Sequence, residues 1–166
     1  TLEQDLVLCE KAGFDYIEIR LDMLTDYLKR HTVEELAAFF CTSRLKPHAF
    51  NALYLYPEFL SEGDDEARQK ELLEEFRLGC EVGRAIGSHY FIIVPPLQRD
   101  PAGGPYTGSW EDTFSNCVRI LKELSRRAEP YDMNLCFELV GFERSSVRSI
   151  GQADAVVRAV DRPNVG

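Results

Sequence analysis

One carboxylate, Glu138, stands near the end of an apolar stretch that is typical of a buried β-strand. Residues 134–140 alternate, with Leu135, Phe137 and Leu139 on one face and Glu138 on the other. A carboxylate on the inward face of a parallel strand is costly to bury unless it is paired, protonated or bound to a cation. We therefore interpret Glu138 as a metal ligand or an acid/base group, with an ion pair to a neighbouring Arg or Lys as the alternative.

Three further polar side chains fall on predicted strands. Glu18 and Arg20 share one face of the stretch 16–21, and Asn51 lies within the stretch 47–55. These side chains have the chemistry to line a pocket for a polar, hydroxyl-bearing substrate. The alternative is structural, with Glu18 and Arg20 paired to each other and to neighbours on the inward face, and with Asn51 satisfied as a strand or turn amide.

The three histidines are not placed to join Glu138 on one metal ion. His31 precedes a predicted helix, and His48 and His89 lie at the beginnings of predicted strands. In a parallel barrel the chemistry gathers at the opposite, carboxyl ends of the strands. We therefore interpret all three as surface or packing residues, and no Ser-His-Asp or Cys-His arrangement is indicated.

Composition excludes two broad classes of function. Of the 166 residues, 19 are Lys or Arg and 28 are Asp or Glu, which gives a formal net charge of −9 that does not suit a binder of nucleic-acid phosphates. No apolar run approaches the ~18 residues of a membrane span. The five cysteines form no C-x-x-C pair, and their odd number argues against a disulfide framework. We expect free thiols and a cytoplasmic protein.

Helices and strands alternate along the chain. Thr-x-x-Gln and Thr-x-x-Glu capping boxes start helices at Thr1 and Thr32, acidic residues 62–66 suit the positive end of the next helix, and Ser109 and Ser149 cap the last two. The pattern predicts strands over 16–21, 47–55, 90–94 and 134–140, with the stub of another at 164–166. The sequence thus predicts five helices and four complete strands.

Two α/β architectures fit this alternation. A doubly wound sheet usually carries a phosphate-binding glycine loop after an early strand, and neither G-x-G-x-x-G nor G-x-x-x-x-G-K-[ST] occurs. A barrel places polar side chains on the inward faces of strands, as Glu18, Arg20 and Glu138 are predicted to lie. We therefore favour a parallel (β/α) barrel of TIM type, as one domain over 1–166, with a doubly wound binding domain as the alternative.

Several stretches resemble the xylose-isomerase-like sugar isomerases and epimerases. Residues 9–20 resemble the helix and second strand of those barrels, 45–53 resemble the third strand, and 134–141 with 164–166 resemble the fifth strand and the entry to the sixth. The resemblance runs along essentially the whole chain, and within the superfamily it is greatest to isomerases of keto-inositols. Apurinic endonucleases of the same barrel place His ligands on strands three and four, where this chain has Asn51, Leu53, Val94 and Pro95.

The resemblance implies a divalent metal (Zn, Mn, Co or Mg), held by a Glu on strand five, an Asp on strand six, a His on strand seven and a Glu on strand eight. Glu138 corresponds to the first ligand and is also the implied catalytic acid/base. Glu18, Arg20 and Asn51 are the implied substrate-binding residues. The implied reaction isomerises a small keto-polyol or ketose, such as 2-keto-myo-inositol, through an enediolate-like intermediate, and a ketose 3-epimerase is the alternative within the superfamily.

The resemblance also implies an incomplete barrel. It covers about strands two to five and the start of strand six, so three metal ligands fall beyond Gly166, and a typical barrel has ~250 residues. The chain begins at Thr1 rather than Met. We expect a truncated chain whose open strand edges pair with another copy or a complementary fragment. A non-catalytic half-barrel that folds by self-association is therefore a second hypothesis.

Overall fold

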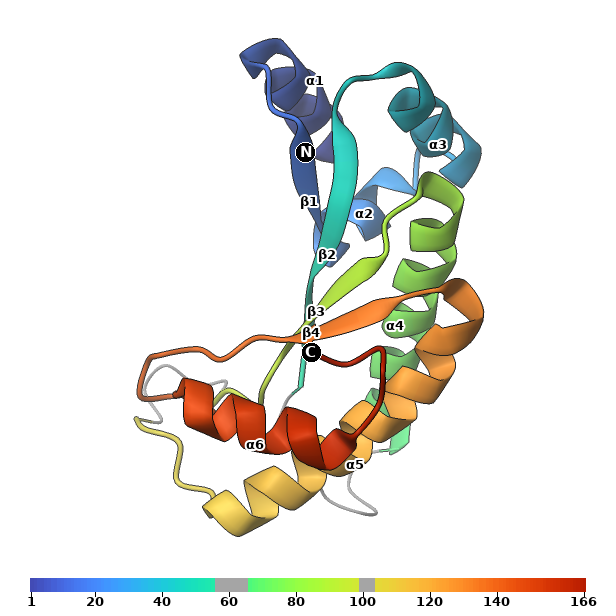
Figure 1. Ribbon diagram of the computed structural model, residues 1–166. Helices are drawn as coiled ribbons and strands as arrows, with labels where there is room; N and C mark the ends of the chain where they lie inside the picture. The colour runs from blue at the N-terminus through green and yellow to red at the C-terminus, as the bar shows by residue number, and fades with distance from the viewer. Residues whose placement is uncertain (56–65, 99–103) are drawn as a thin grey trace.

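Four parallel strands form one sheet in the order β1-β2-β3-β4. The structure is a computed structural model, and it describes residues 1–55, 66–98 and 104–166 (Figure 1). The strands are β1 (Tyr16–Arg20), β2 (Lys46–Tyr54), β3 (Tyr90–Val94) and β4 (Asn134–Phe137). The helices are α1 (Leu2–Ala12), α2 (Leu21–Tyr27), α3 (Val33–Thr42), α4 (Glu66–Ile86), α5 (Trp110–Ala128), the short 3-10 helix η3 (Glu129–Tyr131) and α6 (Ile150–Val160).

Each strand pairs with the strand that follows it in the chain, without a reversal of strand order. This arrangement differs from a doubly wound sheet, in which the order reverses and helices cover both faces. Along β1, Ile19 lies on the face that packs against the helices and is buried. Tyr16, Glu18 and Arg20 lie on the other face and are exposed. The sheet therefore has one face packed on helices and one face open to solvent.

Local sequence signals set most helix boundaries. The amide of Gln4 donates to Thr1 Oγ1 (3.4 Å) and the amide of Glu35 donates to Thr32 Oγ1 (3.2 Å), so both predicted capping boxes are confirmed. Ser109 and Ser149 cap α5 and α6 as predicted. Of the acidic residues at 62–66, only residue 66, which begins α4, lies within the described part of the chain.

The sequence analysis missed one helix and misplaced the end of one strand. Helix α2 was not predicted, because it has seven residues and begins directly after β1 without a side-chain cap. Strand β4 ends at Phe137 rather than at residue 140, because Val140 donates its amide to Val147 of the following loop (3.1 Å) and leaves the sheet. Residues 164–166 do pair in parallel with β4, with the Gly166 amide bonded to the Leu135 carbonyl (2.9 Å).

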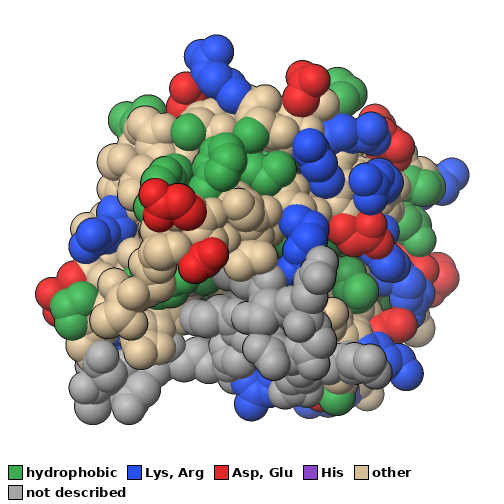
Figure 2. Space-filling view, turned by 90° about the horizontal axis from the view of Figure 1, so that it is seen from below, with side chains coloured by type: hydrophobic (Ala, Val, Ile, Leu, Met, Phe, Trp, Pro, Cys, Tyr) green, Lys and Arg blue, Asp and Glu red, His purple; other side chains and the backbone are tan. Residues whose placement is uncertain are grey.

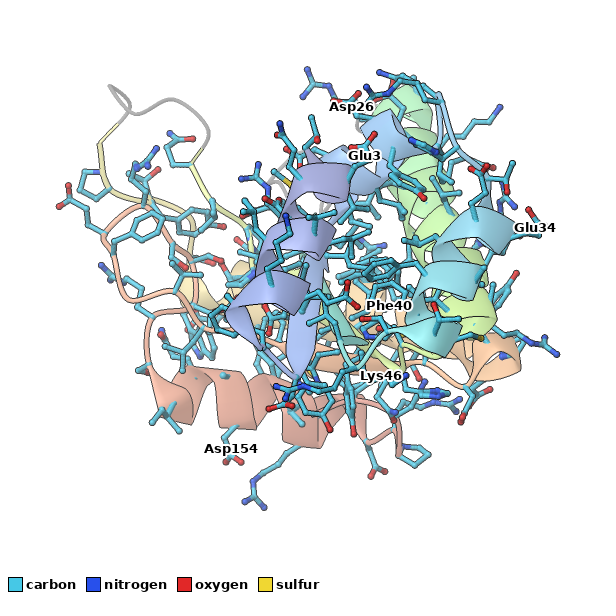
Figure 3. The ribbon with its side chains drawn as sticks, turned by 90° about the horizontal axis from the view of Figure 1, so that it is seen from above. Glu3, Asp26, Glu34, Phe40, Lys46 and Asp154 are labelled. Carbon is cyan, nitrogen blue, oxygen red and sulfur yellow. The ribbon has the colours of Figure 1, made fainter. Side chains whose placement is uncertain are left out.

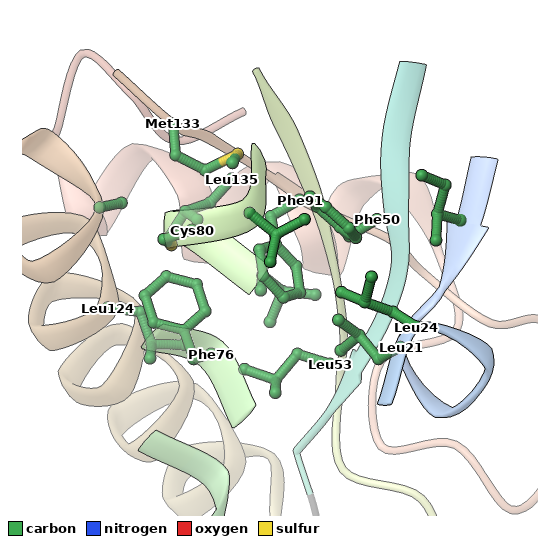
Figure 4. Packing of buried hydrophobic residues seen from close by; sticks show 14 of the residues in the cluster. Leu21, Leu24, Phe50, Leu53, Phe76, Cys80, Phe91, Leu124, Met133 and Leu135 are labelled. Carbon is green, nitrogen blue, oxygen red and sulfur yellow. The ribbon is translucent and has the colours of Figure 1, made fainter. Parts of the chain in front are cut away.

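The core lies between the sheet and α4 and α5. Phe76 of α4 packs on Phe91 of β3 with ring centroids 5.0 Å apart, and Phe50 of β2 lies 5.7 Å from the same ring (Figure 4). Two glycines of α4 make this approach possible: a Cβ at Gly79 would lie 2.5 Å from Phe91 Cε2, and one at Gly83 the same distance from the Met133 side chain. Their lack of side chains brings α4 close to the sheet.

Lys46 links the end of α3 to the start of β2. Its ammonium group donates to the carbonyls of Phe40 (2.8 Å) and Ser43 (2.9 Å), and Phe40 and Lys46 lie close together in Figure 3. A cation suits the negative end of a helix, where carbonyls lack helical partners.

In Figure 2, charged side chains of both signs are interspersed over the visible face. Within the described residues, no helix is both long and apolar enough to span a bilayer.

Candidate active site

The polar residues predicted on β1 and β2 meet on the open face of the sheet. Glu18 and Arg20 project from β1, and Arg20 stands opposite Asn51 of β2 in the parallel register. Asn51 Nδ2 donates a hydrogen bond to Glu18 Oε2 over 3.0 Å. This pairing of Glu18 with a neighbour on the same face agrees with the structural alternative, and a substrate-binding role stays a prediction.

Arg20 is held by Asp22, a residue that the sequence analysis missed. The guanidinium donates from Nε to Oδ1 (3.0 Å) and from Nη2 to Oδ2 (2.6 Å) of that carboxylate. The Met23 amide also donates to Asp22 Oδ1 (2.9 Å), which anchors the carboxylate in the first turn of α2. The hydrogen bond from Arg20 is the largest cause of the lowered pKa of Asp22. Because both side chains are more than half exposed, the pair adds little stability and mainly orients the guanidinium.

A hollow of about 330 Å³ opens at the carboxyl ends of β1 and β2. Its polar lining consists of Arg20, Asp22, Asn51, Tyr54 and Glu75. Glu75 comes from α4, and its pKa is raised, first by burial and second by the charge of Asp22. The strand pattern gave no signal for Glu75, since it lies on a helix between the second and third strands. Asp22 had a weak signal, as a carboxylate two residues after Arg20.

Glu138 lies at the other edge of the sheet. It follows β4 directly, its side chain is exposed, and its amide donates to the Ile93 carbonyl (3.0 Å). Two strands separate it from β1, so the structure does not bring it into the hollow. Burial and, second, the charge of Glu18 raise the pKa of Cys136, which precedes Glu138 by two residues on the same face.

The loops after β3 and β4 are joined beside Glu138. The Gln98 amide donates to the Arg144 carbonyl (2.9 Å), the Tyr106 amide donates to the Glu143 carbonyl (2.9 Å), and Leu97 forms an antiparallel bridge with Ser145. In Figure 1 these two loops run side by side at the lower left. Residues 99–103 of the loop after β3 lie outside the described part of the chain. The joined loops form one rim near the carboxyl ends of the strands.

Residues 6–166 match the sequence profile of the xylose isomerase-like TIM barrel family. The chain belongs to this family. It is 39% identical to an inosose isomerase of Halalkalibacterium halodurans and 37% identical to one of Bacillus subtilis, with 99% of this chain aligned in both cases. These alignments cover 55% and 56% of the two relatives, so the chain spans about half the length of the curated relatives that it matches.

A solved structure supports the same family. The crystal structure of the IOLI protein with a binding zinc atom superposes with a TM-score of 0.85 at 38% identity, over 100% of this chain and 56% of that one. D-psicose 3-epimerase from Clostridium cellulolyticum H10, at 18% identity and a TM-score of 0.76, shares the fold. The parallel α/β fold predicted from the sequence is thus confirmed.

The structure of the IOLI protein contains a zinc atom, and a zinc site needs several ligating side chains. Across residues 1–55, 66–98 and 104–166, no three His, Cys, Asp or Glu side chains come together in a way that could hold a metal ion. His31 stacks on Tyr27 and faces Glu3 and Glu35, while His48 and His89 lie at the amino ends of β2 and β3, as predicted. Glu138 is thus one candidate ligand, and one ligand alone does not make a metal site.

Proposed function

We propose that the polypeptide containing this chain isomerises 2-keto-myo-inositol or a similar ketose, and that this chain supplies part of the substrate-binding face. The observation that carries the proposal is the 39% identity to inosose isomerases along 99% of the chain. The polar array of Glu18, Arg20 and Asn51 on the open face supports it. A polyol offers hydroxyl groups that both donate and accept, and this array contains a cation, an amide and a carboxylate.

The proposed reaction moves a proton beside a ketone. A base removes the proton from the hydroxyl-bearing carbon next to the carbonyl, and the electrons form an enediolate-like intermediate. The hydroxyl proton passes to the former carbonyl oxygen, a proton is returned to the former carbonyl carbon, and the former hydroxyl-bearing carbon becomes the new carbonyl. Glu138 has the chemistry to carry this proton, because an exposed carboxylate at the strand end alternates between acid and base. Arg20 supplies fixed positive charge and hydrogen-bond donors for substrate oxygens. In this proposal, Asn51 and Glu18 orient hydroxyl groups.

A divalent metal (Zn, Mn, Co or Mg) belongs to this proposal. When bound, it supplies positive charge beside the ketone and neighbouring oxygens. Glu138 is the residue of this chain that would hold it. Because the described residues supply no further cluster, the other ligands are proposed to come from elsewhere in the polypeptide. Buried or half-buried free thiols at Cys80, Cys117 and Cys136 support the proposed cytoplasmic location.

We also propose that residues 1–166 are one incomplete barrel domain. In this arrangement, β1 to β4 are the second to fifth barrel strands and residues 164–166 enter the sixth. Within the described chain, β1 pairs on one side alone, with β2, so its other edge is available to further strands. The same edge favours the second hypothesis, a non-catalytic half-barrel that associates with another copy. Sedimentation of the 166-residue chain tests the second hypothesis, since a stable folded monomer contradicts obligatory self-association.

The test of the proposed activity is proton exchange in heavy water. The full natural polypeptide is incubated with 2-keto-myo-inositol and each of the four metals in turn, and products are followed by NMR. The proposal predicts a new keto-inositol with deuterium at the carbon next to the carbonyl. Fructose serves as the comparison ketose, because deuterium at its third carbon would instead support a ketose 3-epimerase. Absence of any new keto-inositol from 2-keto-myo-inositol with every metal contradicts the proposal.

A further inference from the structure

Glu75 brings a carboxylate from α4 into a hollow that is otherwise built from β1, β2 and the start of α2. The other polar groups of the lining are Arg20, Asp22, Asn51 and Tyr54. The volume of about 330 Å³ falls at the lower end of the ~300–1,000 Å³ typical of small-molecule sites. The hollow is therefore large enough for a ligand of the size of a single sugar ring.

The hydrogen bonds within the hollow leave the carboxylate of Glu75 available as an acceptor. Both carboxylate oxygens of Asp22 accept from Arg20, and the amide nitrogen of Asn51 donates to Glu18. In the described part of the chain, Glu75 takes part in no hydrogen bond or ion pair. Glu74 and Glu81, on the same helix, instead pair with Arg77 (3.0 and 2.5 Å).

The surroundings of Glu75 make a neutral donor an effective partner. Burial in the hollow disfavours its charged form, and the nearby negative charge of Asp22 acts in the same direction. A carboxylate that has lost part of its hydration gains most from ligands that donate hydrogen bonds. Two hydroxyl groups on adjacent carbons provide two such donors for its two oxygens. An anionic ligand would instead add repulsion from Asp22 and Glu75.

We propose that Glu75 is a specificity-determining residue that binds adjacent hydroxyl groups of a neutral cyclic polyol, across the hollow from Arg20 and Asn51. The proposal rests on the proposed function, because it assigns a further residue to the substrate-binding face. It adds that a residue outside the strands selects for hydroxyl groups away from the reacting ketone. An interaction of this kind is made equally with the substrate and the transition state, so it lowers KM and leaves kcat nearly unchanged.

The experiment compares Glu75→Gln with Glu74→Gln in the full natural polypeptide. Myo-inositol is the probe for binding by titration calorimetry, because it lacks the ketone and is not turned over. Glu75→Gln removes the charge and places an amide donor where an acceptor is required. We expect it to raise the Kd for myo-inositol and the KM for 2-keto-myo-inositol about tenfold, with kcat within about twofold, because hydrogen bonds to a charged acceptor are stronger than those to a neutral amide. Glu74→Gln should change none of these values.

The readouts separate this proposal from the isomerase assignment. If the unsubstituted polypeptide binds myo-inositol but does not turn over the keto-inositol, the isomerase assignment fails, and the two Kd values still decide the role of Glu75. Equal Kd values for Glu75→Gln and Glu74→Gln overturn the proposal, as does an unsubstituted polypeptide that does not bind myo-inositol. The thermal midpoint of each variant is measured first. If Glu75→Gln unfolds, Glu75→Asp replaces it, and the same weakening of binding is expected because its carboxylate is withdrawn by one methylene.

Discussion

The side-chain amide of Asn51 and the carboxylate of Glu18 are joined by a 3.0 Å hydrogen bond across two adjacent parallel strands. Asn51 stands opposite Arg20 in the strand register, so its amide reaches back along β1 to Glu18. This hydrogen bond fixes the direction of the Asn51 amide on the open face. We propose that the remaining amide oxygen accepts a hydrogen bond from a substrate hydroxyl group.

Replacement of Asn51 by Ala is expected to weaken substrate binding more than folding. The change removes one partly exposed hydrogen bond, which is worth about 0.5–1.5 kcal/mol. We predict a KM for 2-keto-myo-inositol that is about tenfold higher in the natural polypeptide, with a small change in thermal midpoint. His48→Ala, on an exposed side chain at the amino end of the same strand, is the control and should leave KM unchanged. Equal effects of the two changes would show that Asn51 has no part in binding.

Gly79→Ala tests the close packing of α4 on the sheet. The added methyl group would lie 2.5 Å from Phe91 Cε2, and the Phe91 ring is fully buried between Phe50 and Phe76. Overpacking of this kind costs about 1–3 kcal/mol, which outweighs the gain in helix propensity of about 1 kcal/mol. We predict a lower free energy of unfolding in urea.

Gly151→Ala is the matched change, because no heavy atom lies within 4 Å of a Cβ built there on α6. It should be neutral or stabilise the chain by up to about 1 kcal/mol. If Gly79→Ala is as well tolerated as Gly151→Ala, the helix does not approach the sheet as closely as described.

The cysteines should react at very different rates. Burial raises the pKa of the Cys80 and Cys117 thiols to about 12, whereas Cys41 is exposed on α3. Because the thiolate is the reactive form, the two buried thiols should be almost inert to iodoacetamide at pH 8 in the folded protein. Mass spectrometry of peptides after timed labelling measures each site. Cys41→Ser should remove the fastest modification, and rapid labelling of Cys80 or Cys117 without denaturant would contradict the packing.

The predictability of each part depended on the range of the interactions that form it. Capping boxes at Thr1 and Thr32 act over three residues, so the helix starts were predicted from the sequence. Helix α2 was missed because its start at Leu21 lacks a capping side chain and its stability comes from burial of Leu24 and its neighbours. The end of β4 was misplaced because the partner of Val140 lies in a later loop.

The candidate site shows the same limit. Alternation along one strand indicated that Glu18 and Arg20 share a face, and the structure adds Asn51 of β2 to that face. The approach of Glu75 depends on how α4 docks on the sheet, through contacts such as Gly79 with Phe91. No pattern along the chain indicates how closely α4 approaches the sheet. The role of Glu138 stays a prediction, because the described residues contain no partner that assigns it one.

The most direct test of the account is the turnover of 2-keto-myo-inositol by the Glu138→Gln variant of the full natural polypeptide. Glu143→Gln, five residues later in an exposed loop position, is the control. The account predicts at least a ~100-fold loss of turnover for Glu138→Gln, as expected when an acid/base group is removed, and near-normal turnover for the control. Turnover by Glu138→Gln at the rate of the unsubstituted polypeptide would contradict the assignment of Glu138 and, with it, the proposed chemistry of this face.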